Sequence, residues 1–409
     1  MNRRHRRQGG SGPLATGVRG NADQHSGNGA DKPLEYRHLA PIRVAAPPTA
    51  SYLHPSLGGT TIRSTATPHI RASFYALTDR GRTRDHNEDT FLVADLGASA
   101  PIRESRRQEL QVGERGALYL VADGMGGAAA GEVASEMAAT GIYRYLVDTW
   151  QSDHQVSEER FVHRLREAVE LANLDIHNYA REHPEVRGMG TTVTVAGIWH
   201  DRLFLAQIGD SRGYLVRDGE ARQLTRDQSL PQRLVDVGEL TEEEAEASER
   251  RNIILQALGP DSLVKVDLSW QALQQGDVLI ICSDGLSNLV RREDIAQAVK
   301  EEPDMAAVCR RLVALANERG GPDNITVVAV RVDGEGLPKV ASDAPGYHEL
   351  VTSAERPALQ PTSAFPATPR IVEAVPAPLP ARAGSPTGVA LAALAIVMGI
   401  LAIALLLKR

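Results

Sequence analysis

The 409-residue sequence predicts an α+β protein in which sheets pack together and helices cover them from outside. Short runs rich in Val, Ile and Leu are separated by turn residues, as expected of strands. Longer segments show the 3.6-residue apolar periodicity of amphipathic helices. These helices come in pairs between groups of strands, which favours packed sheets over a strictly alternating parallel fold.

The ordered part of the sequence covers about 71–332. Its helical pattern places Met137, Ile142 and Leu146 on one face of a helix, and the turn "RDGE" at 217–220 separates two apolar runs. The predicted helices are 132–150, 158–181 and 303–317. The predicted strands are 74–77, 91–94, 117–122, 191–198, 202–208, 213–216, 263–268, 277–282 and 325–332.

Residues 1–70 are rich in Gly, Pro, Ser, Thr and Arg and show no sustained periodicity, which predicts a disordered basic extension. Up to Pro68 the sequence has nine Lys or Arg against three Asp or Glu. A solvated tail is favoured over a specific nucleic-acid or lipid site. The net charge of −7 gives no nucleic-acid signal, and no nucleic-acid partner is expected.

The last part of the sequence predicts a linker followed by a membrane anchor. Residues 333–387 contain ten prolines in 55 positions and much Ala, which is typical of an extended linker. The stretch 388–407 is twenty residues without a charge. A helix rising 1.5 Å per residue over this stretch would cross a bilayer core of roughly 30 Å. We therefore expect a single-pass protein with a C-terminal transmembrane helix.

Acidic residues recur where apolar strands end in Gly or Asn turns. Four such positions are Asp123, Asp210, Asp284 and Asp323, and a further cluster, "RTRDHNED", precedes a strand. A single strand-end Asp is most often a turn former. Several of them on strands that can converge at one sheet edge instead favour hard divalent cations, Mg²⁺ or Mn²⁺. Such ions held by carboxylates are typical of phosphoester hydrolysis.

Seven motifs along about 74–332 carry a family resemblance. They are "RTRDHNED", "VADGMGGAAAGEVAS", "GMGTTVTVAG", "AQIGDSRGYLVRDGEARQLTRDQSL", "RNIILQALG", "GDVLIICSDGLSNLV" and "GGPDNITVVAV". In this order they resemble bacterial members of the type 2C (PPM) metal-dependent protein serine/threonine phosphatases. The resemblance implies a four-layer α-β-β-α sandwich of two antiparallel sheets flanked by helix pairs, with a flap at about 227–257.

The resemblance also implies metal ligands. Asp123 would bridge two Mn²⁺ or Mg²⁺ ions, and Glu88 and the backbone carbonyl of Gly124 would lie at one of them. Asp284 and Asp323 would complete the other ion. A water activated by both ions would attack phosphorus directly, and the Ser or Thr alkoxide would leave without a phosphoenzyme.

Three further roles follow from the resemblance. Asp89 would act on a metal directly or through water, Asp210 would bind a third ion, and Arg84 would hold the substrate phosphate. A guanidinium suits the last role because it can bind two phosphate oxygens at once.

The sequence departs from the family pattern at Met125 and Gln228. Some relatives have His in place of Met125 as the proposed acid for the leaving group, and Met has no proton to donate. His is also common in place of Gln228, at the start of the flap. A family "HPxRN" stretch is here "SERRN", 248–252. These departures concern specificity and the leaving group, not the metal core.

The resulting prediction is a membrane-anchored signalling enzyme that dephosphorylates proteins and opposes a Ser/Thr kinase, with its catalytic domain in the cytoplasm. Two alternatives stay open. One is a pseudophosphatase that binds phosphoproteins without turnover, which the complete set of predicted ligands disfavours. The other is a metal hydrolase of small phosphoesters, which only the flap, by resemblance, argues against.

Overall fold

The computed structural model describes residues 70–351, except 99, 107, 127–129, 249, 251 and 303 and the side chain at 246. All described residues belong to one compact unit. The predicted basic extension, the greater part of the predicted linker and the predicted transmembrane helix lie outside the described residues. Within the described segment, none of the helices combines the length and apolar character needed to cross a bilayer.

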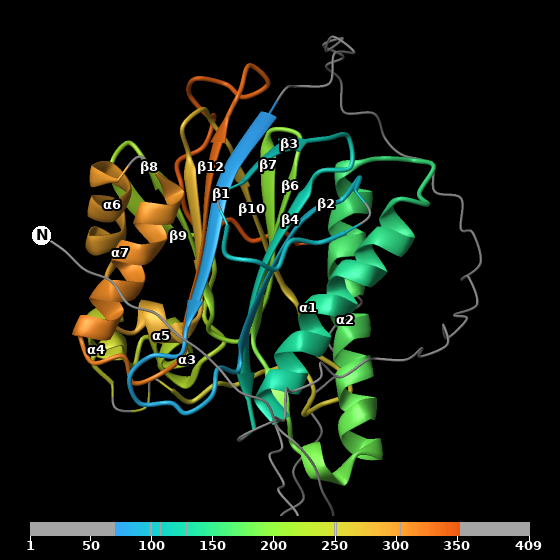
Figure 1. Cartoon of the computed structure of the whole chain (residues 1–409), viewed down its shortest axis with the longest axis vertical. Coiled ribbons are helices and arrows are strands. Elements are labelled where there is room, and N and C mark those ends of the chain that lie inside the picture. The colour runs from blue at the N-terminus through green and yellow to red at the C-terminus, as the bar shows by residue number, and fades with distance from the viewer. Residues whose placement is uncertain are drawn as a thin grey trace, which may run out of the picture. The chain divides into compact units, whose positions relative to one another are not determined.

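Two sheets form the centre of the fold (Figure 1), and their ladders are antiparallel. The first sheet has the order β3-β1-β12-β11-β8-β9, with bounds Gln108–Val112, Ile70–Asp79, Ile325–Asp333, Val278–Cys282, Arg212–Arg217 and Glu220–Gln223. The second has the order β10-β7-β6-β4-β2, with bounds Asp267–Ala272, Arg202–Ile208, Val193–Trp199, Ala117–Met125 and Asp89–Asp95; β5, Gly190–Thr191, pairs with the end of β4.

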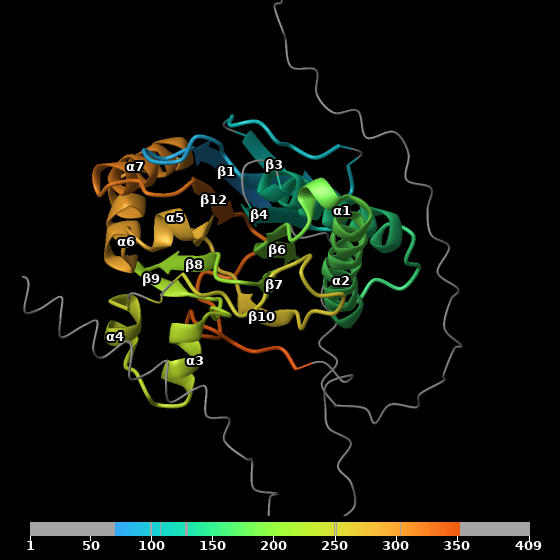
Figure 2. The same ribbon diagram turned by 90° about the horizontal axis from the view of Figure 1, so that it is seen from below.

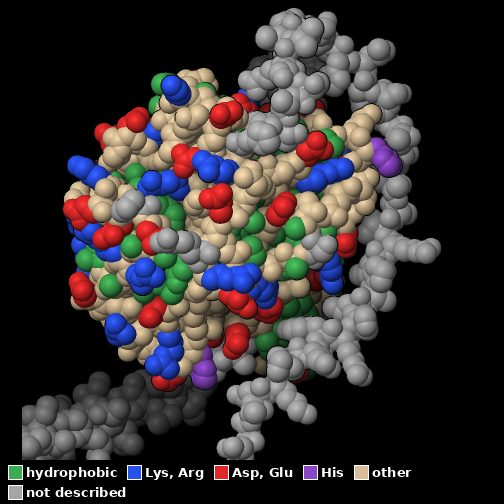
Figure 3. All heavy atoms as spheres, turned by 45° about the horizontal axis from the view of Figure 1, so that its top comes forward, with side chains coloured by type: hydrophobic (Ala, Val, Ile, Leu, Met, Phe, Trp, Pro, Cys, Tyr) green, Lys and Arg blue, Asp and Glu red, His purple; other side chains and the backbone are tan. Residues whose placement is uncertain are grey.

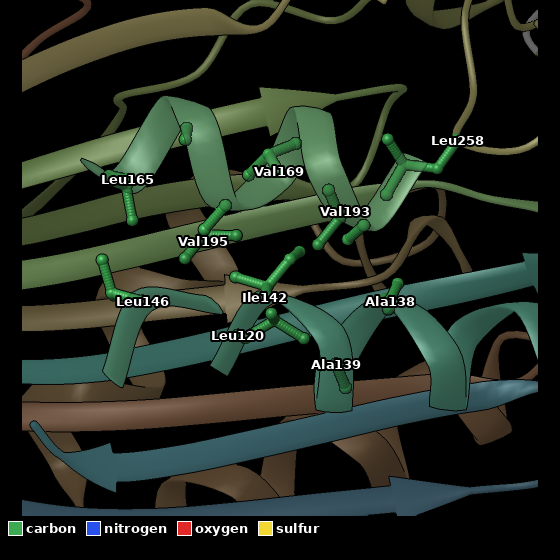
Figure 4. Packing of buried hydrophobic residues seen from close by; sticks show 14 of the residues in the cluster. Leu120, Ala138, Ala139, Ile142, Leu146, Leu165, Val169, Val193, Val195 and Leu258 are labelled. Atoms are coloured by element: carbon green, nitrogen blue, oxygen red, sulfur yellow. The ribbon is translucent and has the colours of Figure 1, made fainter. Parts of the chain in front are cut away.

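Helix pairs cover the outer faces of both sheets, and three apolar clusters fill the spaces between the layers. Helices α1 (Ala130–Trp150) and α2 (Glu158–Glu182) lie on the second sheet, and α6 (Arg292–Glu301) and α7 (Met305–Glu318) on the first. Figure 4 shows Ile142 of α1 beside Leu120 of β4, with Leu165 of α2 in the same apolar cluster. The α+β class with two antiparallel sheets is therefore confirmed.

Shorter helices lie at the end of the sandwich where β4 and β11 end. They are α5 (Asp284–Ser287), α3 (Leu230–Asp236) and α4 (Glu242–Glu246), with the 3-10 helix η1 (Pro184–Val186) after α2. Helix α4 begins with a capping box: the Thr241 hydroxyl accepts from the Glu244 amide at 3.2 Å, and the Glu244 carboxylate accepts from the Thr241 amide at 2.8 Å. This short acidic helix lies within the predicted flap, about 227–257.

Several elements differ from the sequence-based prediction. The strand predicted at 263–268 is β10 at Asp267–Ala272, because its register is set by pairing with β7. The edge strands β3 and β9 were not predicted, since "QELQV" and "EARQ" have no apolar run. Helix α7 begins at Met305 with Asp304 as its N-cap, two residues after the predicted start.

The packed part of the chain also continues beyond the predicted boundary at 332. Residues 338–351, which we call the strap, leave the end of β12 and run back to β10. Figure 2 shows this orange-red end of the coloured chain beside β10. On the face in Figure 3, acidic and basic side chains are interspersed rather than separated by sign.

Candidate active site

The predicted carboxylates meet at one end of the sandwich because antiparallel strands alternate in direction. Asp89 begins β2 and lies opposite Asp123, near the end of β4, in the ladder between these strands. Asp284 follows β11 as the first residue of α5, and Asp323 precedes β12. Asp210 lies between β7 and β8. Turns that are remote in the sequence therefore open onto the same place.

Hydrogen bonds to backbone groups of Asp123 and Gly124 hold the end of β4 in place. The carbonyl of Asp123 accepts from the Thr192 amide and from the Thr191 hydroxyl, each at 2.9 Å. The amide of Gly124 donates to the Glu88 carbonyl at 3.2 Å. A Cβ on Gly124 would lie 2.2 Å from the carbonyl oxygen of Gly131, so no side chain fits there. Glycine is required at this position by the close approach of α1 and the loop before β2.

Two carboxylates in the cluster keep an oxygen without a partner. Asp89 accepts through Oδ2 from the Ser283 hydroxyl at 2.8 Å. Its Oδ1 is buried and has no hydrogen-bond partner among the described residues, and the same holds for Oδ1 of Asp210. A buried unpaired carboxylate oxygen is costly, so these two atoms indicate a missing positive partner.

The carboxyl groups also disfavour one another's ionisation. Burial raises the pKa of Asp89 to about 7, with Asp284 and Asp323 adding to the effect. Burial and then Asp284 raise the pKa of Asp210 to about 8. Burial followed by Asp89 raises the pKa of Asp123 well above its ordinary value, and burial followed by Asp323 raises that of Asp284. Without cations this cluster favours protonated carboxyl groups.

The donor set fits a hard divalent cation. Its members are carboxylates with unpaired oxygens, and no His or Cys is among them. In the range that the structure describes, no group of three or more His, Cys, Asp or Glu side chains is arranged to hold an ion as it stands. The fit therefore rests on the chemistry of the donors and their mutual repulsion.

Arg84 lies at the mouth of the cluster. Its Nη2 donates to Oδ2 of Asp323 at 2.8 Å, and nearly half of its side chain is exposed. Neighbouring Glu88 is buried, and burial raises the pKa of its carboxyl, while Arg84 acts to lower it. The eight residues predicted for the site, Arg84, Glu88, Asp89, Asp123, Gly124, Asp210, Asp284 and Asp323, are all brought to this end of the sandwich.

Asn324 holds the loop that carries Arg84 and Glu88. This asparagine was not among the predicted site residues. Its Oδ1 accepts from the Glu88 amide at 2.8 Å, and its Nδ2 donates to the carbonyls of Arg80 and His86 at 3.0 and 2.9 Å. Each amide atom of this buried side chain thus fastens the loop to the start of β12. Its place directly after Asp323 in "GGPDN" was the available clue.

The flap joins the site at Gly209 and Asp210. The side chain of Gln228 accepts from the Gly209 amide at 2.9 Å, and the backbone amide of Gln228 donates to the Gly209 carbonyl at 2.9 Å. Gln256 donates to Oε1 of Gln228 at 2.9 Å. Gln228, noted above as a departure, therefore has a structural role at the base of the flap.

A cavity of about 1510 Å³ lies beside the cluster. Asp210 and Asp284 lie in its wall, together with residues of the flap helices, the start of α6 and the strap. The paired Arg212 and Asp227, joined by Nη2 and Oδ2 at 2.6 Å, also line it. The groove thus meets the carboxylate cluster at Asp210 and Asp284.

Comparisons with known proteins agree with this geometry. The family model "Protein phosphatase 2C" matches residues 106–326. The serine/threonine phosphatase stp of Listeria monocytogenes is 38% identical over 257 residues, which is 63% of this chain and 94% of the relative. The protein phosphatase PhpP of Streptococcus pneumoniae is 40% identical over 218 residues, 53% of this chain and 87% of the relative.

Solved structures of serine/threonine phosphatases are also similar to this chain. The Mycobacterium tuberculosis serine/threonine phosphatase PstP/Ppp is 36% identical, with a TM-score of 0.54 over 64% of this chain and 99% of that chain. The catalytic domain of the serine/threonine protein phosphatase PstP in complex with 2 manganese ions is 36% identical, with a TM-score of 0.52 over 64% of this chain and 99% of that chain. The chain therefore belongs to the protein phosphatase 2C family.

Proposed function

We propose that this protein hydrolyses phosphoserine and phosphothreonine in other proteins and so opposes a Ser/Thr kinase. The observation that carries the proposal is the convergence of buried carboxylates, two of them with unpaired oxygens, beside an open groove. The names of relatives that are serine/threonine phosphatases support the substrate class.

We infer that two or three Mn²⁺ or Mg²⁺ ions occupy the carboxylate cluster. The 2 manganese ions in the structure of the PstP catalytic domain support this choice. Asp123, Glu88 and the Gly124 carbonyl would serve one ion, Asp284 and Asp323 another, and Asp89 and Asp210 the remaining positions. When bound, such ions would polarise the phosphoryl oxygens and lower the pKa of the attacking water.

The side chains of this chain would supply orientation and charge. Arg84 would exchange its contact with Asp323 for two phosphate oxygens, which a planar guanidinium can bind together. The carbonyl of Asp123 is tied to Thr191 and Thr192, so its carboxylate is carried on a fixed backbone. Met125 has no proton to give, so the leaving alkoxide would take its proton from water or another side chain.

The change Asp123→Asn tests the activity. We expect Mn²⁺-dependent hydrolysis of p-nitrophenyl phosphate and of a phosphothreonine peptide to fall by about 100-fold or more, the upper effect seen for outer-shell metal partners. Asp175→Asn is the matched control, because Asp175 lies on α2 and bonds Tyr145. Activity that persists in EDTA would contradict the metal mechanism. Binding of the peptide without turnover would favour the pseudophosphatase, and turnover of p-nitrophenyl phosphate alone would favour a small-phosphoester hydrolase.

We also propose that residues 388–407 anchor the protein in a membrane with the phosphatase domain in the cytoplasm. The support is the run of twenty residues without a charge. Deletion of 388–409 should move the protein from the membrane to the soluble fraction. The equally long deletion of 352–373 should leave it sedimenting with membranes. If both deletion variants sedimented with membranes, residues 388–407 would not be the anchor. If protease added outside intact cells cleaved the phosphatase domain, the domain would not lie in the cytoplasm.

A further inference from the structure

The strap is fastened to the edge of the second sheet. The Trp270 amide donates to the His348 carbonyl at 3.0 Å, and the Leu350 amide donates to the Leu268 carbonyl at 2.8 Å. The strap therefore covers the outer edge of β10, whose other edge pairs with β7. Covering an edge strand removes open backbone groups that would otherwise pair with another chain.

A buried ion pair holds the middle of the strap. Arg217 bonds both carboxylate oxygens of Asp277, at 2.8 and 2.6 Å. Its Nη1 donates to the Asp343 carbonyl at 2.9 Å. Because Arg217 and Asp277 are almost fully buried, this contact ties the strap to the core of the first sheet rather than to a surface side chain.

The strap then passes the flap. Tyr347 donates its hydroxyl to Oδ1 of Asp267 at 2.8 Å. Arg226, which bonds Asp236 at the end of α3, lies close enough to Tyr347 and Asp267 to interact with both electrostatically. This places the strap next to the base of the flap.

Residues 345–347 of the strap line the same groove as Asp210 and Asp284. At about 1510 Å³, the groove exceeds the roughly 300–1,000 Å³ that suits a drug-sized ligand, so a phosphate group alone would fill little of it. The strap lies outside the residues matched by the family model, 106–326.

We propose that residues 345–347 form part of the wall that binds the polypeptide on either side of the phosphorylated residue. This inference rests on the proposed phosphatase function and assigns the strap to substrate selection. A small phosphoester held at the carboxylate cluster would not extend to the strap, whereas a peptide held there would extend along the groove from Asp210 and Asp284 to residues 345–347.

Gly346 offers a direct test. A Cβ added to Gly346 would meet no atom within 4 Å, and its φ is not in the left-handed region, so a side chain there is compatible with the fold. The backbone amide of Gly346 donates a hydrogen bond to Oε1 of Gln271 at 3.1 Å, and a side chain at residue 346 leaves this hydrogen bond in place. In the full chain, Gly346→Trp should lower the ratio of kcat/KM for a phosphothreonine peptide to that for p-nitrophenyl phosphate by about tenfold, and Gly346→Leu should lower it less.

Gly113→Trp is the matched control, because Gly113 also has no atom within 4 Å of an added Cβ and lies outside the groove lining. It should leave the ratio and both activities unchanged. A ratio that is unchanged in Gly346→Trp, or an equal loss with both substrates, would overturn the role of the strap. Failure of the parent protein to hydrolyse either substrate would instead refute the proposed function.

Discussion

Buried polar atoms without hydrogen-bond partners have different consequences in the core and at the candidate active site of this protein. Tyr119 lies between the two sheets, edge-to-face with Phe74, and its buried hydroxyl has no partner in the described part of the chain. The unpaired oxygens of Asp89 and Asp210 instead lie where carboxylates converge beside a groove. An unpaired hydroxyl in an apolar layer only costs stability, whereas unpaired carboxylate oxygens in a cluster provide a site for cations.

Removing the hydroxyl of Tyr119 should stabilise the fold. Tyr119→Phe keeps the ring and its packing, so we expect the free energy of unfolding to rise by about 1 kcal/mol. Urea titration followed by circular dichroism measures this change. Tyr145→Phe is the control and should lose about 1 kcal/mol, because its hydroxyl donates to Asp175 at 2.7 Å. A loss of stability in Tyr119→Phe would show that its hydroxyl has a partner.

At the scale of elements, the local apolar pattern predicted those helices and strands that bury one face. The predicted helix at 158–181 is α2 at Glu158–Glu182, where the Ser157 hydroxyl caps the first turn by accepting from the Arg160 amide at 3.2 Å. Edge strands such as β9 were missed, because their residues are polar and only pairing with a neighbour makes them strands. The sequence assigned the strap to the linker, because the strap is held by hydrogen bonds to residues that are remote in the sequence.

At the scale of the whole molecule, the carboxylate cluster couples stability to pH and cations. The folded pKa of Asp89 is about 7 and that of Asp210 about 8, both above the ordinary value of roughly 3.9. The folded state therefore binds more protons than the unfolded state between about pH 4 and pH 8. The free energy of unfolding of the cation-free protein must fall as pH rises across this window.

Thermal unfolding in EDTA should accordingly show a lower Tm at pH 8 than at pH 5. Because about 1 kcal/mol moves Tm by roughly 2–4 °C in a domain of this size, the expected shift is several degrees. Added Mn²⁺ should raise Tm most at pH 8, where the carboxylates are ionised. Asp210→Asn should raise the cation-free Tm at pH 8 but not at pH 5. A Tm difference between this variant and the parent that is independent of pH would contradict the expectation.

The sequence by itself determined the α+β class, three of the four helices that cover the sheets, most of the strands, and the acidic residues at strand ends, since each depends on short-range pattern. By resemblance it also predicted eight site residues, and the fold brings these eight residues to one end of the sandwich. Only the tertiary structure decided that Asn324 clamps the Arg84 loop, that Asp89 and Asp210 keep unpaired oxygens, and that the strap walls the groove. These features join residues far apart in the sequence, and such contacts depend on how layers pack rather than on any local run of residues.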